Sequence, residues 1–160
     1  MTLERAYLHA LRVLAERTKA SRVRWIIIGS ASLAVQGVHI RPRDIDILTD
    51  MRGAFEFNTL LKDYENTPVR FSRSEIFESY FGIFKIEGVI VEVMGDLKMR
   101  YGNQWASLAE LRVPKFVEID GLRLPVAELH HQLASYEALN RKTDNKKVAE
   151  LRKLVLGKSY

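Results

Sequence analysis

The spacing of apolar residues divides the start of the chain into a helix, a strand and a second helix. Apolar side chains recur at helical intervals from residue 3 to about residue 19, which predicts an amphipathic helix. The four apolar residues from Trp25 to Ile28 are typical of a fully buried strand. Residues 30–36 then predict a short helix, because Gly37 supplies an end signal.

A period of two follows over residues 44–48, where two aspartates alternate with two isoleucines. This alternation predicts a strand with one apolar and one polar face. Thr49 or Asp50 can then cap a helix whose apolar residues, up to Tyr64, share one buried face.

Two hairpins and two helices are expected in the second half of the chain. The hairpins turn at Glu87-Gly88 and at Asp120-Gly121, each between alternating segments. Helical periodicity returns at Ala127, and a last helix is expected over residues 144–156. This order of helices and strands predicts an α+β domain with a mixed sheet, not a doubly wound α/β domain.

Composition agrees with one soluble globular domain over residues 1–160, with a core over about 23–120 and a helical part over about 126–157. The chain has no cysteine, which excludes disulfides, thiolate zinc sites and a cysteine nucleophile. Charges occur throughout the N-terminal stretch, and no apolar run approaches the roughly 20 residues that span a bilayer. We therefore expect a cytoplasmic protein that does not associate with membranes.

The net charge of +5 is concentrated in residues 141–160, which carry seven lysines or arginines and two acids. The other 140 residues are balanced. Such a run is most often the solvated face of a terminal helix. The alternative is a positive edge that faces a nucleotide phosphate or an RNA.

Asp44 and Asp46 are the main candidates for chemistry. Both share the polar face of the predicted strand, although aspartate is a poor strand former and two like charges repel. A divalent cation such as Mg²⁺ would compensate this repulsion. Glu92, on the polar face of the strand over residues 89–94, would supply the third carboxylate of a two-metal site if the two strands are neighbours. Solvated aspartates and an ordinary exposed glutamate are the alternative interpretation.

Gly29 and Ser30 stand between the first strand and the short helix. Glycine lets the backbone approach a bound group closely, and a helix start offers N–H groups and a positive dipole end to a phosphate. Ser30 adds a hydroxyl donor. The same serine can serve as an N-cap, and the two roles are compatible.

Together these segments resemble the polymerase-β-type nucleotidyltransferase superfamily. The segment "IIIGSASLAVQGVHIRPRDIDI" is similar to its signature of a strand, Gly-Ser, a helix and an Asp-x-Asp strand. "GVIVEVMGDL" looks like the third-carboxylate strand of its minimal and small-molecule members, which include aminoglycoside and lincosamide adenylyltransferases. "ALNRKTDNKKVAEL" looks like their C-terminal helix start. The resemblance covers most of residues 23–156 and implies a polymerase-β-like palm with flanking helices.

The resemblance also implies a role for each candidate residue. Gly29 and Ser30 would hold the outer phosphates of a nucleoside triphosphate. Asp44 and Asp46 would bind Mg²⁺, with Glu92 as the third carboxylate acting as ligand or general base. Either Arg43 beside the aspartates, or Lys142 and Lys147 near the C-terminal helix, would neutralise the triphosphate. The superfamily's third carboxylate is most often aspartate, so Glu92 departs from the pattern.

The expected activity is Mg²⁺-dependent transfer of a nucleoside monophosphate, AMP from ATP, to an acceptor hydroxyl with release of pyrophosphate. The acceptor is a small molecule, a protein side chain or an RNA end, and the sequence does not decide among them. A catalytically inactive, antitoxin-like module that binds a partner is the alternative that the Glu92 departure allows. The two repelling aspartates argue against it. A third hypothesis is an RNA-binding domain that uses the basic C-terminal segment.

Overall fold

The structure is a computed structural model that describes residues 3–107 and 113–157, so the last three residues of the basic C-terminal segment lie outside it. The helices are α1 (Arg5–Thr18), α2 (Gly29–Val35), α3 (Met51–Leu60), α4 (Leu129–Leu139) and α5 (Asn145–Leu156), with 3-10 turns η1 (Lys62–Tyr64) and η3 (Lys142–Asp144). The strands are β1 (Trp25–Ile28), β2 (Ile45–Thr49), β3 (Glu65–Arg73), β4 (Phe77–Ile86), β5 (Val89–Tyr101), β6 (Gln104–Ser107), β7 (Lys115–Ile119) and β8 (Leu122–Val126).

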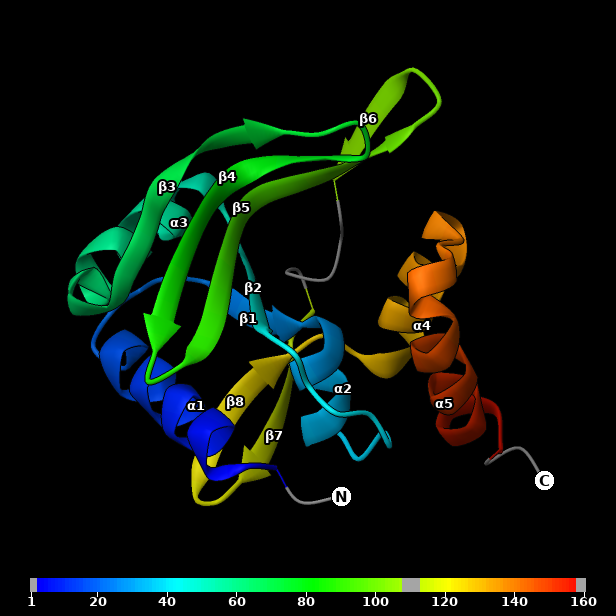
Figure 1. Ribbon diagram of the computed structural model, residues 1–160, viewed down its shortest axis with the longest axis horizontal. Helices are drawn as coiled ribbons and strands as arrows, with labels where there is room; N and C mark the ends of the chain where they lie inside the picture. The colour runs from blue at the N-terminus through cyan, green and yellow to red at the C-terminus, as the bar shows by residue number, and fades with distance from the viewer. Residues whose placement is uncertain (1–2, 108–112, 158–160) are drawn as a thin grey trace.

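All of these strands join one mixed sheet, with the order β3-β4-β5-β2-β1-β8-β7 and with β6 beside β5 (Figure 1). The β2–β5 and β1–β8 pairs are parallel, and the other pairs are antiparallel. This arrangement confirms the predicted α+β class and the mixed sheet.

Local signals read from the sequence explain several of these elements. Glu87-Gly88 and Asp120-Gly121 have positive φ angles at all four residues, as a two-residue hairpin turn requires. The Asp50 carboxylate caps α3 by accepting a hydrogen bond from the Gly53 N–H at 2.7 Å. Both hairpins and the cap were predicted, and the structure confirms them.

Strand β3 was not predicted, because it lacks a burial signal. It is an edge strand in which most side chains are exposed, and it contains Pro68. Strand β5 is also longer than the alternation over residues 89–94 suggested. Its register against β4 shifts near Asp96, which has a φ of +49° and forms a bulge that bends the strand.

Two hydrophobic clusters fix the positions of the helices. The larger one packs α1 and α3 against one face of the sheet around side chains such as Leu11, Phe57 and Phe84. A smaller one joins α2 to α4 and α5 through Leu33, Leu133 and Leu151. Helices α4 and α5 therefore lie together on one side of the molecule, across from the curved β3-β4-β5 arm (Figure 1). No described helix is long and apolar enough to cross a membrane.

Candidate active site

The parallel pairing of β2 and β5 brings two of the predicted carboxylates together. In this register Asp46 stands directly beside Glu92. The residues on either side of each acid are fully buried, which turns both acids to the opposite face of the sheet: Ile45, Ile47, Val91 and Val93. The register that alternation predicted is the one observed. Asp44 lies one residue before β2 and is partly buried.

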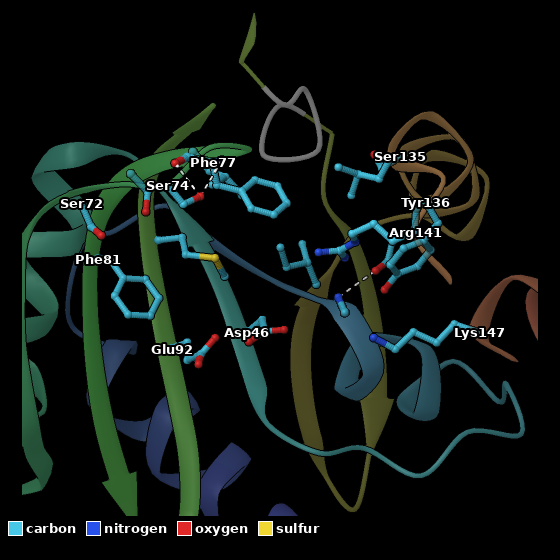
Figure 2. Close-up of a pocket in the computed structure, with 17 residues that line it drawn as sticks. Asp46, Ser72, Ser74, Phe77, Phe81, Glu92, Ser135, Tyr136, Arg141 and Lys147 are labelled. Atoms are coloured by element: carbon cyan, nitrogen blue, oxygen red, sulfur yellow. Dashed lines mark hydrogen bonds between the residues drawn. The ribbon is translucent and has the colours of Figure 1, made fainter. Parts of the chain in front are cut away.

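Asp46 and Glu92 lie in a pocket of about 380 Å³, between a wall of strands and a wall of helices (Figure 2). The sheet wall comes from β3, β4 and β5 and the turn between β3 and β4. The helical wall comes from α4, from α5 and from Arg141 in the link between them. Side chains that line the sheet wall are Ser72, Ser74, Phe77, Ser79, Phe81, Met94 and Leu97. Those that line the helical wall are Gln132, Ser135, Tyr136, Leu139, Arg141 and Lys147.

The surroundings of Asp46 and Glu92 disfavour a negative charge on both carboxyl groups at once. Burial, followed by the negative charges of Glu92 and Asp44, raises the pKa of Asp46 to about 7, while the charge of Lys147 opposes the rise. Burial, the largest cause, and the charge of Asp44 raise the pKa of Glu92, while a hydrogen bond from Asp46 lowers it. The pair therefore binds a proton more tightly than two solvated carboxyl groups would. Asp46 Oδ1 is buried and has no hydrogen-bond partner, a state that a bound cation would relieve.

These carboxylates fit a divalent cation that binds together with a phosphate. Among residues 3–107 and 113–157, no three acidic or histidine side chains converge closely enough to hold an ion by themselves. Mg²⁺ is commonly bound by one or two carboxylates, with water and substrate phosphates as its other ligands. Asp46 and Glu92 provide these two carboxylates. Asp44 is close enough for its negative charge to raise the pKa of both groups.

Gly29 occupies a position that no side chain could fill. Its φ is +71°, and a Cβ atom there would lie 2.7 Å from Asp46 Oδ2. Its N–H donates a hydrogen bond to Gln132 Oε1 at 2.9 Å. The start of α2, the Asp46 carboxylate and helix α4 therefore meet at this residue, which lines the pocket between the two walls.

Gln132 ties α4 to this turn, and sequence analysis did not identify it. The residue is only 4% exposed, and its amide nitrogen donates to Ser32 Oγ at 2.9 Å. The next residue, Leu133, belongs to the apolar periodicity of α4. The sequence signal for Gln132 was therefore only its position beside the buried face of a predicted helix.

Replacing Gln132 with leucine should destabilise the protein by about 1–3 kcal/mol, because the Gly29 N–H and the Ser32 hydroxyl would lose their partner. Urea unfolding measures the change. The control is Gln104→Leu at an exposed position of β6, where we expect little effect. Equal destabilisation by both substitutions would contradict a specific role for Gln132.

The other predicted site residues lie in different places. Lys147 lines the pocket. Ser30 is buried, and its hydroxyl accepts a hydrogen bond from the Arg43 N–H at 3.2 Å, so its observed contact orders the loop before Asp44. The side chains of Arg43 and Lys142 are exposed, and neither residue lines the pocket.

The helical wall carries two cations around one buried acid. Asp144 is 2% exposed, and its carboxylate contacts Arg141 Nε at 2.8 Å and Lys147 Nζ at 3.8 Å. The Arg141 guanidinium also lies over the Phe77 ring of β4, 5.6 Å from its centroid. Burial, followed by the charge of Asp144, raises the pKa of Tyr136 beside them. Arg141 and Tyr136 were not singled out from the sequence as site residues, although Arg141 lies in the motif "ALNRKTDNKKVAEL".

The raised pKa of Asp46 predicts that stability falls as pH rises from about 4 to about 7. Over this range the native protein holds a proton that the unfolded chain releases, so deprotonation favours unfolding. Urea midpoints at pH 5 and pH 8 measure the change. Asp46→Asn should remove this component. An identical pH dependence in the wild type and the variant would show that Asp46 titrates normally.

Comparisons with known proteins identify the family of this chain. A family model described as aminoglycoside-2''-adenylyltransferase matches residues 10–151, whereas no curated protein matches the chain. Among solved structures, TM1012 from Thermotoga maritima, a proposed nucleotidyltransferase, is 35% identical with a TM-score of 0.83. The alignment covers 98% of this chain and 96% of that protein.

Two more distant structures share the fold. ANT(2'')-Ia in complex with adenylyl-2''-tobramycin is 10% identical with a TM-score of 0.59, covering 96% of this chain and 91% of that one. The lincosamide antibiotic adenylyltransferase LnuA, bound to lincomycin, is 16% identical with a TM-score of 0.59, covering 97% of this chain and 100% of that one. The family match confirms the resemblance seen in the sequence: this chain belongs to the aminoglycoside-2''-adenylyltransferase family and is a nucleotidyltransferase of the polymerase-β type.

Proposed function

We propose that the protein transfers AMP from ATP to an acceptor hydroxyl in an Mg²⁺-dependent reaction that releases pyrophosphate. The observation that carries this proposal is the pairing of Asp46 with Glu92 on adjacent parallel strands, facing one pocket beside Gly29. Two close carboxyl groups with raised pKa values are suited to hold a cation and to accept a proton. The family match and the adenylylated product bound to ANT(2'')-Ia support AMP as the transferred group.

The triphosphate would lie along the helical wall. Lys147 and Arg141 supply positive charge there, and Gly29 leaves room for a phosphate beside Asp46. Asp46 and Glu92 would hold Mg²⁺, with Asp44 as the nearby third acid. When bound, the ion would neutralise phosphate charge and orient the reacting phosphate.

In the transfer step the acceptor oxygen forms a bond to the α-phosphorus of ATP. The bond from that phosphorus to the oxygen bridging to the β-phosphate breaks, and pyrophosphate leaves with the electron pair. Glu92 is part of the sheet wall, because it lies on β5 and lines the pocket. Its carboxylate is therefore the group that takes the proton of the acceptor hydroxyl.

Calorimetry with a non-hydrolysable ATP analogue tests the donor half of this proposal. We expect Mg²⁺ to strengthen binding by roughly tenfold or more, because the carboxylates repel a triphosphate that arrives without a cation. Asp46→Asn should remove most of the Mg²⁺ effect. Binding that is indifferent to Mg²⁺ and to Asp46 would contradict the proposal and favour the antitoxin-like, partner-binding alternative.

A further inference from the structure

The two walls of the pocket differ in charge. Among the described lining residues, the acids are Asp46 on β2 and Glu92 on β5, and the cations are Arg141 and Lys147 on the helical wall. The other described side chains of the sheet wall are phenylalanines, serines, a methionine and a leucine. Apart from Glu92, the described lining of the sheet wall therefore offers hydroxyl groups and apolar surface, and no charge.

A hydroxyl group of the sheet wall faces the pocket. Ser79 lines the pocket on the same face of β4 as Phe77 and Phe81, and the residue is 6% exposed. Its hydroxyl oxygen is not among the enclosed side-chain atoms without a partner, which among the described residues are Gln36 Oε1 and Asp46 Oδ1. Its partner in the β3–β4 register is Ser72, which also lines the pocket. Because this hydroxyl is reached from the pocket, it is available to form a hydrogen bond with a polar group of a bound ligand.

Apolar side chains lead from this serine to the catalytic carboxylates. Met94 follows Glu92 by two residues on the same face of β5, and Phe81 of β4 pairs with it in the register. In Figure 2 the Phe81 ring lies on the sheet wall, on the same side as the Glu92 carboxylate. A flat or apolar body packed on Phe81 and Met94 would place a hydroxyl group close to Glu92.

The same wall is unsuited to a polycation. An aminoglycoside such as tobramycin, the acceptor portion of the product bound to ANT(2'')-Ia, carries several ammonium groups at neutral pH. The two acids among the described lining residues are those that the proposed reaction uses, so further ammonium groups would be buried without a counterion. The net charge of +5 on the chain adds a long-range repulsion.

We propose that the sheet wall binds the acceptor, and that this acceptor is an uncharged hydroxyl compound with an aromatic or apolar body, not a polycationic aminoglycoside. The inference rests on the proposed function for the identity of the reacting hydroxyl. Ser79 determines specificity by hydrogen-bonding a polar group of the acceptor, and Phe81 holds its apolar body.

A ligand-observed NMR screen of the intact protein, saturated with Mg²⁺ and a non-hydrolysable ATP analogue, tests this proposal. The probes are two matched sets of fragments: uncharged hydroxylated aryl compounds, including 4-nitrophenyl glucoside, and polyamines, including tobramycin. Hits are counted only if Phe81→Ala or Ser79→Ala weakens them while Phe116→Ala, at an exposed site on β7, does not. We expect such hits to come from the uncharged set, with roughly three- to tenfold weaker binding after Ser79→Ala.

Phe81→Leu and Ser79→Ala keep the measurement interpretable if Phe81→Ala does not fold. Variant-sensitive hits dominated by polyamines, or the absence of any variant-sensitive hit, would overturn the proposed acceptor class.

Pyrophosphate release with the hits is then measured. Uncharged compounds that bind at Phe81 and Ser79 but are never adenylylated would support the acceptor site and contradict the proposed transferase reaction, so the two failures are distinguishable.

Discussion

Replacing Asp46 with asparagine is expected to reduce nucleotidyl transfer by roughly a thousandfold, because the proposed cation loses a ligand worth several kcal/mol of charge stabilisation in the transition state. Glu92→Gln should have an effect of the same order. The fold should survive both changes. At pH 8 each variant should be at least as stable as the wild type, because the repulsion between the paired carboxylates is removed. Pyrophosphate release with the acceptors found by screening measures activity, and urea unfolding measures stability.

Asp96→Asn is the matched control for these substitutions. Asp96 lies on β5 four residues beyond Glu92, is exposed and is not part of the pocket lining. Its positive φ is one that asparagine adopts readily, so the exchange should change neither activity nor stability appreciably. Unfolding of the Asp46 variant would instead mean that the carboxylate has a structural role.

Substituting alanine for Gly29 is expected to be as damaging as the loss of a carboxylate. The new Cβ atom would lie 2.7 Å from Asp46 Oδ2, and alanine would have to adopt a φ of +71°. The backbone strain alone costs about 1–2 kcal/mol, and moving the Asp46 carboxylate disrupts the pair with Glu92. We expect transfer to fall by roughly a hundredfold or more, because small displacements of reacting groups have effects of that size.

Gly37→Ala is the control that separates the backbone strain in Gly29→Ala from the contact of its Cβ atom with Asp46. Gly37 has a φ of +89°, and a Cβ atom added there meets nothing within 4 Å. This variant should show the backbone strain in its urea midpoint while transfer remains normal. Comparable loss of transfer in the two glycine variants would contradict the contact between Gly29 and Asp46 as the cause.

The alternation of apolar residues predicted the faces on which Asp46 and Glu92 lie, but not that their strands are neighbours. One-residue slips in β2 or β5 would have placed a carboxylate in the core, so burial of Ile47 and Val93 fixed the faces of Asp46 and Glu92 before their strands were known to be parallel neighbours. Turn residues such as Asp120-Gly121 fixed the hairpins in the same way.

The rest of the site depends on packing that has no local signal. Strand β3, which contributes Ser72, is exposed along most of its length, so its residues show no apolar face. Gln132 and Tyr136 lie in a helix whose periodicity indicated only a buried stripe. They reach the pocket because α4 and α5 pack on α2 through the smaller cluster around Leu33. Contacts between residues a hundred positions apart, such as Gly29 with Gln132, follow from that docking.

The cation-assisted carboxylate pair is the central claim, and anomalous X-ray scattering from Mn²⁺ tests it most directly. Crystals of the protein with Mn²⁺ and a non-hydrolysable ATP analogue should show a metal peak within about 2.2 Å of carboxylate oxygens of both Asp46 and Glu92, allowing slightly longer bonds than those of Mg²⁺. The triphosphate should contact the same ion and extend towards Lys147 and Arg141. A bound analogue whose metal lies away from Asp46 and Glu92, or a pocket that takes up neither ion nor nucleotide, would contradict the account.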